Sequence, residues 1–485
     1  AQVDLEQSGG SLDFTNSTCS SWARISHDYV NMTNVSFASY LNLVSASNHA
    51  HLNNVTLGTQ LRGTVNDLRL EDVDTGYGEY TLRANKFWMS NSTFKASSNP
   101  SNYHIYVSDL DNANNASSSD VYIYNSTIIF DANRDESDEF VFDIYTTGDI
   151  WIIDSEINST GYYYSMIELE GNNVEITNST LYSGTYNDEY HPDPDYLYSY
   201  LNIYSDDLDI TNSYLSTYAS FDCYCSSSSY KLFARSEIDI EAADFTIRDS
   251  TVYSYSYLGR VEWNNAHRAV SSDMEIESSD FVIDNSNLIV KIKPPEYSYC
   301  DSCISADFDL TVDGDLEITD SWLGLEDWTD NYGNGDIGIT ETNYTLKVLN
   351  STIRSGLYAC EESCSSTYYN SDVRVRNSTL YGGFYAYQSL NFTLHNSEVN
   401  GPLKITSVNT TMSDSKINDM TYIDSRVIKI TDMSRLHGLQ DHPNVFNPSN
   451  HVTIHNVTLT AQVDLEQSGG SLDFTNSTCS SWARI

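Results

Sequence analysis

The stretch DLEITDSWL, residues 315–323, contains the pattern that decides the fold of this chain. Leu316 and Ile318 are apolar, and the residues between and after them are polar. Asp320 and Ser321 follow, and Leu323 is the next apolar residue at an expected inward position. Alternation with a period of two indicates a strand with one buried face. The stretch therefore predicts a short β-strand, a turn at Asp320, and a second strand that begins directly after it.

The same pattern recurs along the whole chain. We aligned the sequence on each Asn or Asp that follows apolar-x-apolar-x, and 18 positions before residue 461 qualify. The residue two before is apolar in all 18, the residue three after is apolar in 16, and the residue one after is Ser in 13. Composition alone does not produce columns this regular, so they indicate an internal repeat. The aligned positions are Asn16, Asn34, Asn54, Asp72, Asn91, Asn125, Asp154, Asn178, Asn212, Asp249, Asn285, Asp320, Asn350, Asn377, Asn396, Asp414, Asp432 and Asn456.

The spacing of these positions predicts how the strands are arranged. Successive positions are mostly 18 to 20 residues apart near the two ends and 24 to 37 apart in the middle. A rung of ~18 residues, at ~3.3 Å per residue, makes one closed coil of two or three short strands. Antiparallel hairpins would show Asn-Gly or Asp-Gly turns, which are nearly absent. The sequence therefore predicts an all-β fold, a parallel β-solenoid of about 18 rungs.

The rungs differ in length. We expect short rungs in residues 1–91 and 350–460, and rungs with long loops in residues 92–349. The additional residues of the middle rungs are rich in Tyr, Ser and Asp. We interpret them as loops and added strands on one side of the coil.

At the level of fold, the whole chain resembles the right-handed parallel β-helix family, the architecture of pectate lyases, tailspikes and many surface adhesins. The aligned Asn and Asp residues look like that family's asparagine ladder. The resemblance implies a right-handed coil, in which Asn adopts the left-handed conformation at a corner and its amide bonds to neighbouring rungs. We interpret these side chains as turned into the coil.

The first 25 residues of the chain are identical to its last 25, residues 461–485, while the rungs between them differ freely. We interpret residues 1–460 as one continuous solenoid unit and residues 461–485 as the start of the next identical unit. The predicted partners are therefore copies of this chain, stacked end to end. About 18 rungs at ~4.8 Å each predict an axial repeat of roughly 86 Å. An artificial duplication of the first 25 residues is the alternative.

Composition indicates where such a chain is found. A formal net charge of −44 excludes nucleic acid as a partner, because its phosphates would be repelled. No stretch approaches the ~18 continuous apolar residues that span a bilayer. We count 15 Asn-x-Ser/Thr sequons before residue 461, which favours an extracellular or cell-surface glycoprotein. Nine of these Asn residues belong to the ladder, so N-linked glycans are predicted at the other six: Asn31, Asn115, Asn158, Asn343, Asn391 and Asn409.

The cysteines also favour an oxidising compartment, because six of them form close pairs in polar segments. We expect local disulfides in the two wider pairs. A bridge within the third pair would be strained, so a partner on another loop is an alternative there, and the spacings also permit a metal site. The pairs are Cys300 with Cys303, Cys360 with Cys364, and Cys223 with Cys225. Cys19 stands in an inward apolar column and is predicted to be a core residue.

Two segments carry oxygen-bearing side chains in a pattern that suits a calcium ion. Neither matches the EF-hand loop, and ordinary solvated acidic loops are the alternative. No other cofactor is predicted. The candidate ligands are Asp131, Asn133 and Asp135 in the first segment, and Asp327, Asp330 and Asp336 in the second.

Catalysis is not expected. The residue sets of polygalacturonase-like β-helices are missing as a set, and Lys and Arg total only 24, with no cluster beside acids and His. The leading hypothesis is a structural subunit of an extracellular glycosylated filament or surface fibre, with Tyr-rich segments making lateral contacts. The alternative is a carbohydrate-binding adhesin whose Tyr residues stack on sugars. A polysaccharide lyase or hydrolase ranks third.

Overall fold

The computed structural model describes most of the chain, and the described residues form strands and turns without any helix. Every strand pairing recorded for them is parallel. The predicted all-β fold, a parallel β-solenoid, is therefore confirmed, while its handedness and number of rungs stay predictions. The described residues are 3–6, 10–59, 61–76, 81–97, 104–107, 120–131, 139–187, 196–221, 231–258, 267–293, 304–326, 333–340, 344–359, 371–441, 451–465 and 470–484.

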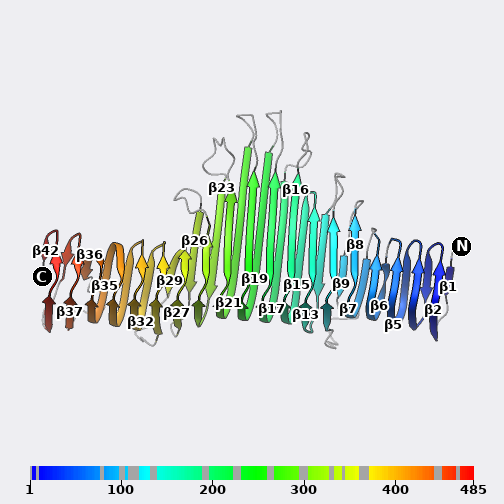
Figure 1. The fold of residues 1–485 in the computed structure, drawn as a ribbon, viewed down its shortest axis with the longest axis horizontal. Coiled ribbons are helices and arrows are strands. Elements are labelled where there is room, and N and C mark those ends of the chain that lie inside the picture. Colours follow the sequence, from blue (N-terminus) through cyan, green and yellow to red (C-terminus); the bar gives the residue numbers. More distant parts are fainter. Residues whose placement is uncertain are drawn as a thin grey trace. The chain divides into compact units, whose positions relative to one another are not determined.

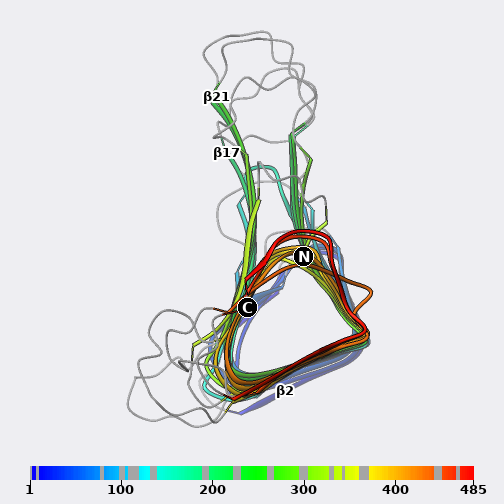
Figure 2. The ribbon, with the colours of Figure 1, turned by 90° about the vertical axis from the view of Figure 1, so that its left-hand side faces the viewer.

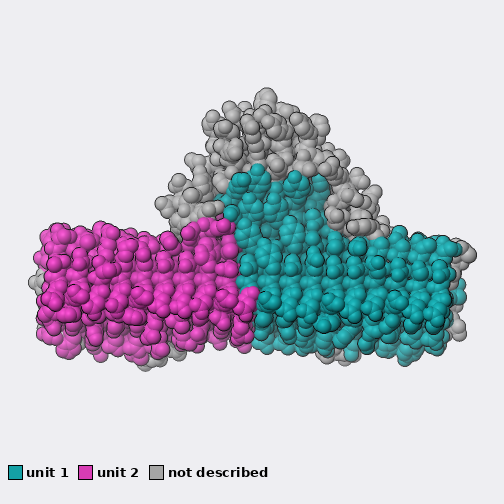
Figure 3. All heavy atoms as spheres, viewed as in Figure 1, with its two compact units in different colours: residues 1–242, 250–274, 291–305 teal, residues 243–249, 275–290, 306–485 magenta. Residues whose placement is uncertain are grey.

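The chain divides into two compact units, which we describe separately (Figure 3). Unit 1 comprises residues 1–242, 250–274 and 291–305, and unit 2 comprises residues 243–249, 275–290 and 306–485. Four strands contain residues of both units: β19 (Lys231–Arg248), β21 (His267–Asp284), β22 (Asn287–Lys293) and β23 (Ile304–Val312).

In unit 1 the strands lie side by side in parallel ladders (Figure 1). The strands that belong wholly to this unit are β1 (Val3–Glu6), β2 (Ser11–Cys19), β3 (Ala23–Ser26), β4 (Tyr29–Phe37), β5 (Leu41–Leu57), β6 (Leu61–Thr75), β7 (Thr81–Ser90), β8 (Thr93–Ser97), β9 (His104–Val107), β10 (Val121–Tyr124), β11 (Thr127–Asp131), β12 (Glu139–Tyr145), β13 (Ile150–Ile153), β14 (Glu156–Gly161), β15 (Tyr164–Thr177), β16 (Thr180–Asn187), β17 (Tyr196–Thr211), β18 (Tyr214–Phe221) and β20 (Thr251–Leu258).

Unit 2 is built in the same way from shorter strands. Its strands are β24 (Leu316–Thr319), β25 (Trp322–Leu325), β26 (Gly333–Ile339), β27 (Thr345–Leu349), β28 (Thr352–Arg354), β29 (Gly356–Ala359), β30 (Ser371–Arg376), β31 (Thr379–Leu380), β32 (Phe384–His395), β33 (Glu398–Val399), β34 (Leu403–Ser413), β35 (Lys416–Thr431), β36 (Arg435–Asp441), β37 (His451–His455), β38 (Thr458–Leu459), β39 (Val463–Asp464), β40 (Ser471–Thr475), β41 (Thr478–Cys479) and β42 (Ala483–Arg484).

Each turn of the coil has three sides (Figure 2). In the rung that contains the DLEITDSWL stretch these sides are β24, β25 and β26, and they pair with β27, β28 and β29 of the next rung. Leu316, Ile318 and Leu323 are fully buried, as the alternation predicts. One rung cannot bury its apolar face alone, so stacking of successive rungs provides the continuous core.

The middle rungs of unit 1 were expected to carry loops and added strands. The described part of these segments consists of lengthened strands, and the residues expected to form loops lie outside the described residues. For example, β17 has 16 residues and pairs with β15 along 13 positions. Figure 2 shows β17 running beyond the three-sided coil as one of two facing layers. The described additional residues therefore extend the sheets.

The space between these facing layers is filled by small hydroxyl side chains. Ser165 of β15, Ser183 of β16 and Ser199 of β17 are fully buried. The Ser183 hydroxyl donates to Ser165 Oγ at 2.9 Å, and Ser199 Oγ donates to the Ser183 carbonyl at 2.6 Å. Buried polar groups require such partners, and short side chains let the two layers approach closely. The tyrosines that alternate with these serines consequently lie on the outer faces.

Candidate functional site

The aligned Asn and Asp residues occupy one corner of the coil in each unit. All 18 have a left-handed backbone, with φ between 44° and 55°, and Asn476 has φ of 50°. Most residues adopt this conformation at a cost of roughly 1–2 kcal/mol, whereas Asn and Asp tolerate it. The residue type at the corner is therefore set by backbone geometry.

Most of the asparagines in this column also bond to the preceding rung. In each recorded pair the amide Nδ2 donates to Oδ1 of the Asn or Asp one rung earlier, at 2.6 to 3.0 Å. The pairs in unit 1 are Asn34 to Asn16, Asn54 to Asn34, Asn125 to Asn91, Asn178 to Asp154, and Asn212 to Asn178. Those in unit 2 are Asn285 to Asp249, Asn377 to Asn350, Asn396 to Asn377, and Asn456 to Asp432.

The expectation that these side chains turn into the coil is wrong. All 18 residues are exposed, and their amide and carboxylate groups run along the outside of the corner. The reason is that a left-handed residue interrupts the strand alternation. Ile176 and Ser179 are both buried, while Asn178 between them faces outward.

The inward position at the corner is the next residue, a role that the sequence analysis missed. This residue is Ser in most rungs, and 12 of these serines are buried. Ser213 is typical: its Oγ accepts the backbone N–H of Ser179 at 3.0 Å and donates to the Thr211 carbonyl at 2.8 Å. The buried corner serines are Ser92, Ser126, Ser155, Ser179, Ser213 and Ser250 in unit 1, and Ser286, Ser321, Ser351, Ser378, Ser397 and Ser415 in unit 2.

The signal for these serines was present in the sequence. Where the residue after the Asn or Asp is not Ser, it is Val or Met in all five rungs, and these five side chains are buried. A column that holds Ser in most rungs and Val or Met in the others indicates an inward position. The five residues are Val35, Val55, Val73, Met433 and Val457.

Four of the six sequons predicted to carry glycans lie on described strands. Asn31 is exposed, and its Nδ2 donates to Asp13 Oδ1 at 2.9 Å. Asn158 is half-buried and accepts the Thr160 hydroxyl. Asn391 and Asn409 are half-buried neighbours, joined by a hydrogen bond of 3.0 Å. The other two, Asn115 and Asn343, lie outside the described residues.

The six paired cysteines, Cys223, Cys225, Cys300, Cys303, Cys360 and Cys364, also lie outside the described residues. Cys19 is half-buried rather than fully in the core. Of the proposed calcium ligands, Asn133, Asp135, Asp327 and Asp330 are not described, and only the backbone of Asp131 is. Asp336 lies exposed on β26. Within the described ranges, no group of three or more His, Cys, Asp or Glu residues is arranged to hold a metal ion.

The outer face of β15 and β17 in unit 1 carries a dense set of tyrosines. Tyr196, Tyr198 and Tyr200 alternate along β17, with ring centroids 5.9 and 6.0 Å apart and nearly parallel planes. Tyr164 of β15 packs against Tyr200 at 5.5 Å. Such rows present flat aromatic area with polar hydroxyls at the rim, the chemistry that suits lateral contacts and sugars alike.

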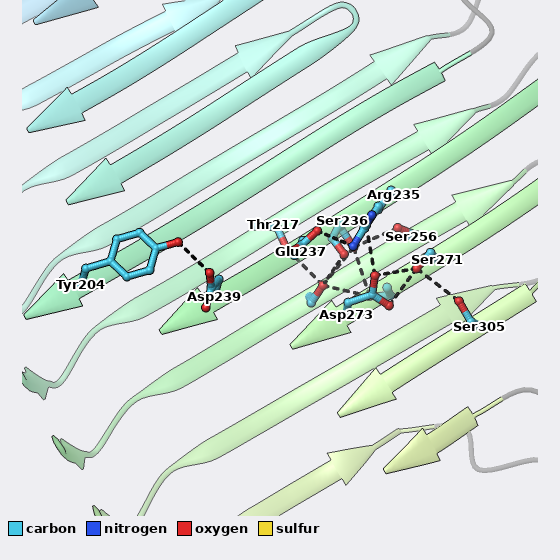
Figure 4. Close-up of polar contacts among 12 residues, drawn as sticks. Tyr204, Thr217, Arg235, Ser236, Glu237, Asp239, Ser256, Ser271, Asp273 and Ser305 are labelled. Carbon is cyan, nitrogen blue, oxygen red and sulfur yellow. Dashed lines mark hydrogen bonds and ion pairs between the residues drawn. The ribbon is translucent and has the colours of Figure 1, made fainter. Parts of the chain in front are cut away.

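Charged groups continue this face on the next rungs (Figure 4). Arg235 of β19 lies 2.7 Å from Glu237 and 3.2 Å from Asp273 of β21, and Ser271 donates to Asp273 at 2.7 Å. Further along, the Tyr204 hydroxyl donates to Asp239 at 2.6 Å. Burial and this hydrogen bond raise the pKa of Tyr204, which keeps the phenol protonated. The face can therefore offer hydrogen-bond donors and acceptors to a ligand.

Three carboxylates lie together on neighbouring strands of this face. Asp143 of β12 is directly opposite Glu168 of β15, and Glu170 is two residues further along. Burial, followed by the charges of Glu168 and Glu170, raises the pKa of Asp143 to about 6. No positively charged group among the described residues lowers the pKa of Asp143, so repulsion from Glu168 and Glu170 adds to the cost of ionising it.

No protein-family model, curated protein or solved structure matches this chain. Within the part of the chain that the structure describes, no helix has the length and apolar character needed to cross a bilayer.

Proposed function

We propose that this chain is a structural subunit of an extracellular, glycosylated filament or surface fibre in which β-solenoid units stack end to end. One observation carries the proposal. The repeated sequence pairs with the following rung where it stands at residues 11–15, and with the preceding rung where it stands at residues 471–475. Residues 11–15 of β2 pair with residues 29–33 of β4. The same five residues, Ser471–Thr475, pair with His451–His455. One rung of this sequence therefore fits between residues 451–465 of one 460-residue repeat and residues 29–43 of the next repeat.

The first strand of the chain supports the same arrangement. In β1, Val3 pairs with Ala23, and the identical pairing recurs between Val463 and Ala483. Val463 pairs on its other edge with Leu439. In that second copy the strand closes a rung whose other two sides are His451–His455 and Thr458–Leu459. In an array, β1 would close the last rung of the preceding 460-residue repeat in the same way.

The side chains on the two edges are compatible because they use different atoms. Toward the preceding rung, Ser471 Oγ contacts His451 Nδ1 at 2.8 Å. Toward the following rung, Asp13 Oδ1 accepts the Asn31 amide at 2.9 Å. A single rung can make both contacts at once.

An aromatic pair points to the same join. Trp22 stacks on Tyr40 of the following rung, with centroids 5.3 Å apart and planes 6° apart. The equivalent Trp482 has 54% of its surface exposed. In an array the Tyr40 of the next unit would cover it, and such a pair contributes about 0.5–1.5 kcal/mol beyond its buried area.

Electron microscopy of the material isolated from the producing cells tests the proposal. We expect filaments with an axial repeat of roughly 86 Å, from about 18 rungs at ~4.8 Å. Discrete short particles would refute the end-to-end arrangement.

A matched pair of variants tests the join itself. The backbone N–H of Thr478 donates to the Val457 carbonyl at 3.0 Å, and Thr18 is its equivalent in the first copy. Thr18→Pro removes this donor from an array, whereas Thr18→Ala keeps it. We expect T18P to shorten the filaments and T18A to leave their length unchanged. Equal filament lengths for the two variants would contradict this model of the join.

The tyrosine face favours a second function, that of a carbohydrate-binding adhesin. Tyr196 is 40% exposed and continues the row formed by Tyr198 and Tyr200, so sugar rings have an aromatic surface to stack on. Binding to a glycan array that Tyr198→Ala abolishes, without turnover of the sugar, would support it. A chain that binds no glycan would leave lateral filament contacts as the use of this face.

A further inference from the structure

The position of the ladder side chains decides whether the sequons among them can be glycosylated. Nine of the ladder asparagines are sequons, and a side chain turned into the coil could not carry a sugar. Their side chains are exposed on the outside of the corner. The obstacle to modification at these positions is therefore absent, and the remaining question is whether the ladder hydrogen bonds survive it.

The direction of the ladder answers that question. Asn178 Nδ2 donates toward Asp154 on the preceding rung at 3.0 Å, while its Oδ1 accepts from Asn212 on the following rung at 2.6 Å. Donor and acceptor thus point to opposite sides along the stack, as they do in a trans peptide group. The amide uses the N–H that is anti to its C=O, and the second N–H is left for another bond. A trans secondary amide keeps the first N–H.

The neighbours of each sequon determine which one has room. Asn16, Asn34 and Asn54 are consecutive sequons, so glycans on them would compete for space at a rung spacing of ~4.8 Å. Asn178 differs, because neither of its ladder neighbours can be modified. Asp154 has no amide, and Asn212 is followed by Ser and Tyr, which is not a sequon.

The surroundings of Asn178 also suit a sugar. The sequon hydroxyl, Thr180, pairs in register with Tyr214 of the next rung, and Tyr214 is 42% exposed. An exposed aromatic ring beside the attachment point offers apolar contact to the first sugar ring.

We infer that the exposed ladder sequons are N-glycosylation sites and that Asn178 is the site with the most room. The sugar comes from a lipid-linked oligosaccharide diphosphate before the chain folds. Asn178 Nδ2 forms a bond to the sugar C1, the bond from C1 to the diphosphate oxygen breaks, the lipid diphosphate leaves with the electron pair, and one Nδ2 proton is released. The glycan then projects from the corner of the coil, and the ladder bond to Asp154 remains.

This inference rests on the proposed extracellular location, and glycopeptide mass spectrometry of the protein isolated from its producing cells tests it. We expect a sugar on the peptide that contains Asn178 and none on the peptide that contains Asn212, which has the same corner geometry but no sequon. A bare Asn178 beside glycosylated Asn158 or Asn391 would overturn the inference, and so would a protein without any N-linked sugar.

A variant and a second readout keep the two proposals separable. Thr180→Ala should remove one glycan while it leaves Asn178 and the thermal midpoint of the protein in place. Microscopy of the same preparation reports on the filament: filaments with a bare Asn178 overturn only the glycan inference, whereas a glycosylated Asn178 in short particles overturns only the end-to-end arrangement.

Discussion

Ser213→Ala tests whether the corner serines stabilise the coil through hydrogen bonds or through packing. Ser213 Oγ is the acceptor for the buried N–H of Ser179, at 3.0 Å. The Thr211 carbonyl, which accepts the Ser213 hydroxyl, also accepts the N–H of Asn178 and keeps that partner. The substitution therefore leaves one buried donor unsatisfied, which costs about 1–3 kcal/mol.

Ser216→Ala is a matched control on the same rung. Ser216 is also buried, with 2% of its surface exposed, but its Oγ has no hydrogen-bond partner among the described residues. Removal of a buried hydroxyl that lacks a partner is neutral or stabilising. Both variants delete a buried hydroxyl, but only S213A loses hydrogen bonds.

Native-state hydrogen exchange is the suitable assay, because a long solenoid need not unfold as one cooperative unit. A loss of 1–3 kcal/mol in the free energy of local opening speeds exchange of the Ser179 amide by roughly 5- to 140-fold. We expect this acceleration in S213A and none in S216A. Equal exchange rates in the two variants would show that the serine column contributes only its small volume, and the hydrogen-bond argument would be wrong.

Three further predictions follow from the geometry. The pKa of Asp143 is about 6 in the fold, above the value of ~3.9 for an unfolded chain. The stability that the protonated carboxyl contributes is therefore fully present below pH 4 and is lost as pH rises through 6. Thermal melts should show that Asp143→Asn stabilises unit 1 at pH 7 and has no such effect at pH 4. Asn285, with φ of 46°, should tolerate Gly better than Ala, by about 1 kcal/mol in denaturant titrations. Gly324 has φ of 117°, and a Cβ there would lie 2.5 Å from the Arg354 carbonyl oxygen, so Gly324→Ala should increase hydrogen exchange in β25 and β28.

The three-sided coil was predictable because its columns are redundant. Each inward position is repeated in rung after rung, so a residue such as Ile318 is identified as buried by its own strand and by every aligned strand. The corner was predictable for a similar reason, since few residue types tolerate a left-handed backbone. Repetition of one local rule therefore determines most of the fold.

The direction of the corner side chains could not be taken from the resemblance to β-helices. It follows from counting residues across the corner. The inward residue two before the Asn and the inward residue three after it are five positions apart. Because five is odd, the inward and outward alternation of the strand must change phase at the Asn. The residue after the Asn then shares its face with the inward residue two positions later. Ser179 and Leu181 are both fully or nearly fully buried, as that count requires.

In the lengthened strands, the pattern of apolar residues predicts the wrong face of the strand as the buried one. In β17, Tyr198 and Tyr200 are larger and more apolar than Ser199 between them, yet Ser199 is the buried residue. The interior there is set by the distance between two facing layers, and only a small side chain that bonds across the gap to Ser183 fits it. That distance depends on pairing between strands far apart in the sequence, so no single strand specifies it. The displaced tyrosines form the outer aromatic face, and the same constraint that fills the interior with serine therefore creates the surface on which contacts with neighbours or sugars would depend.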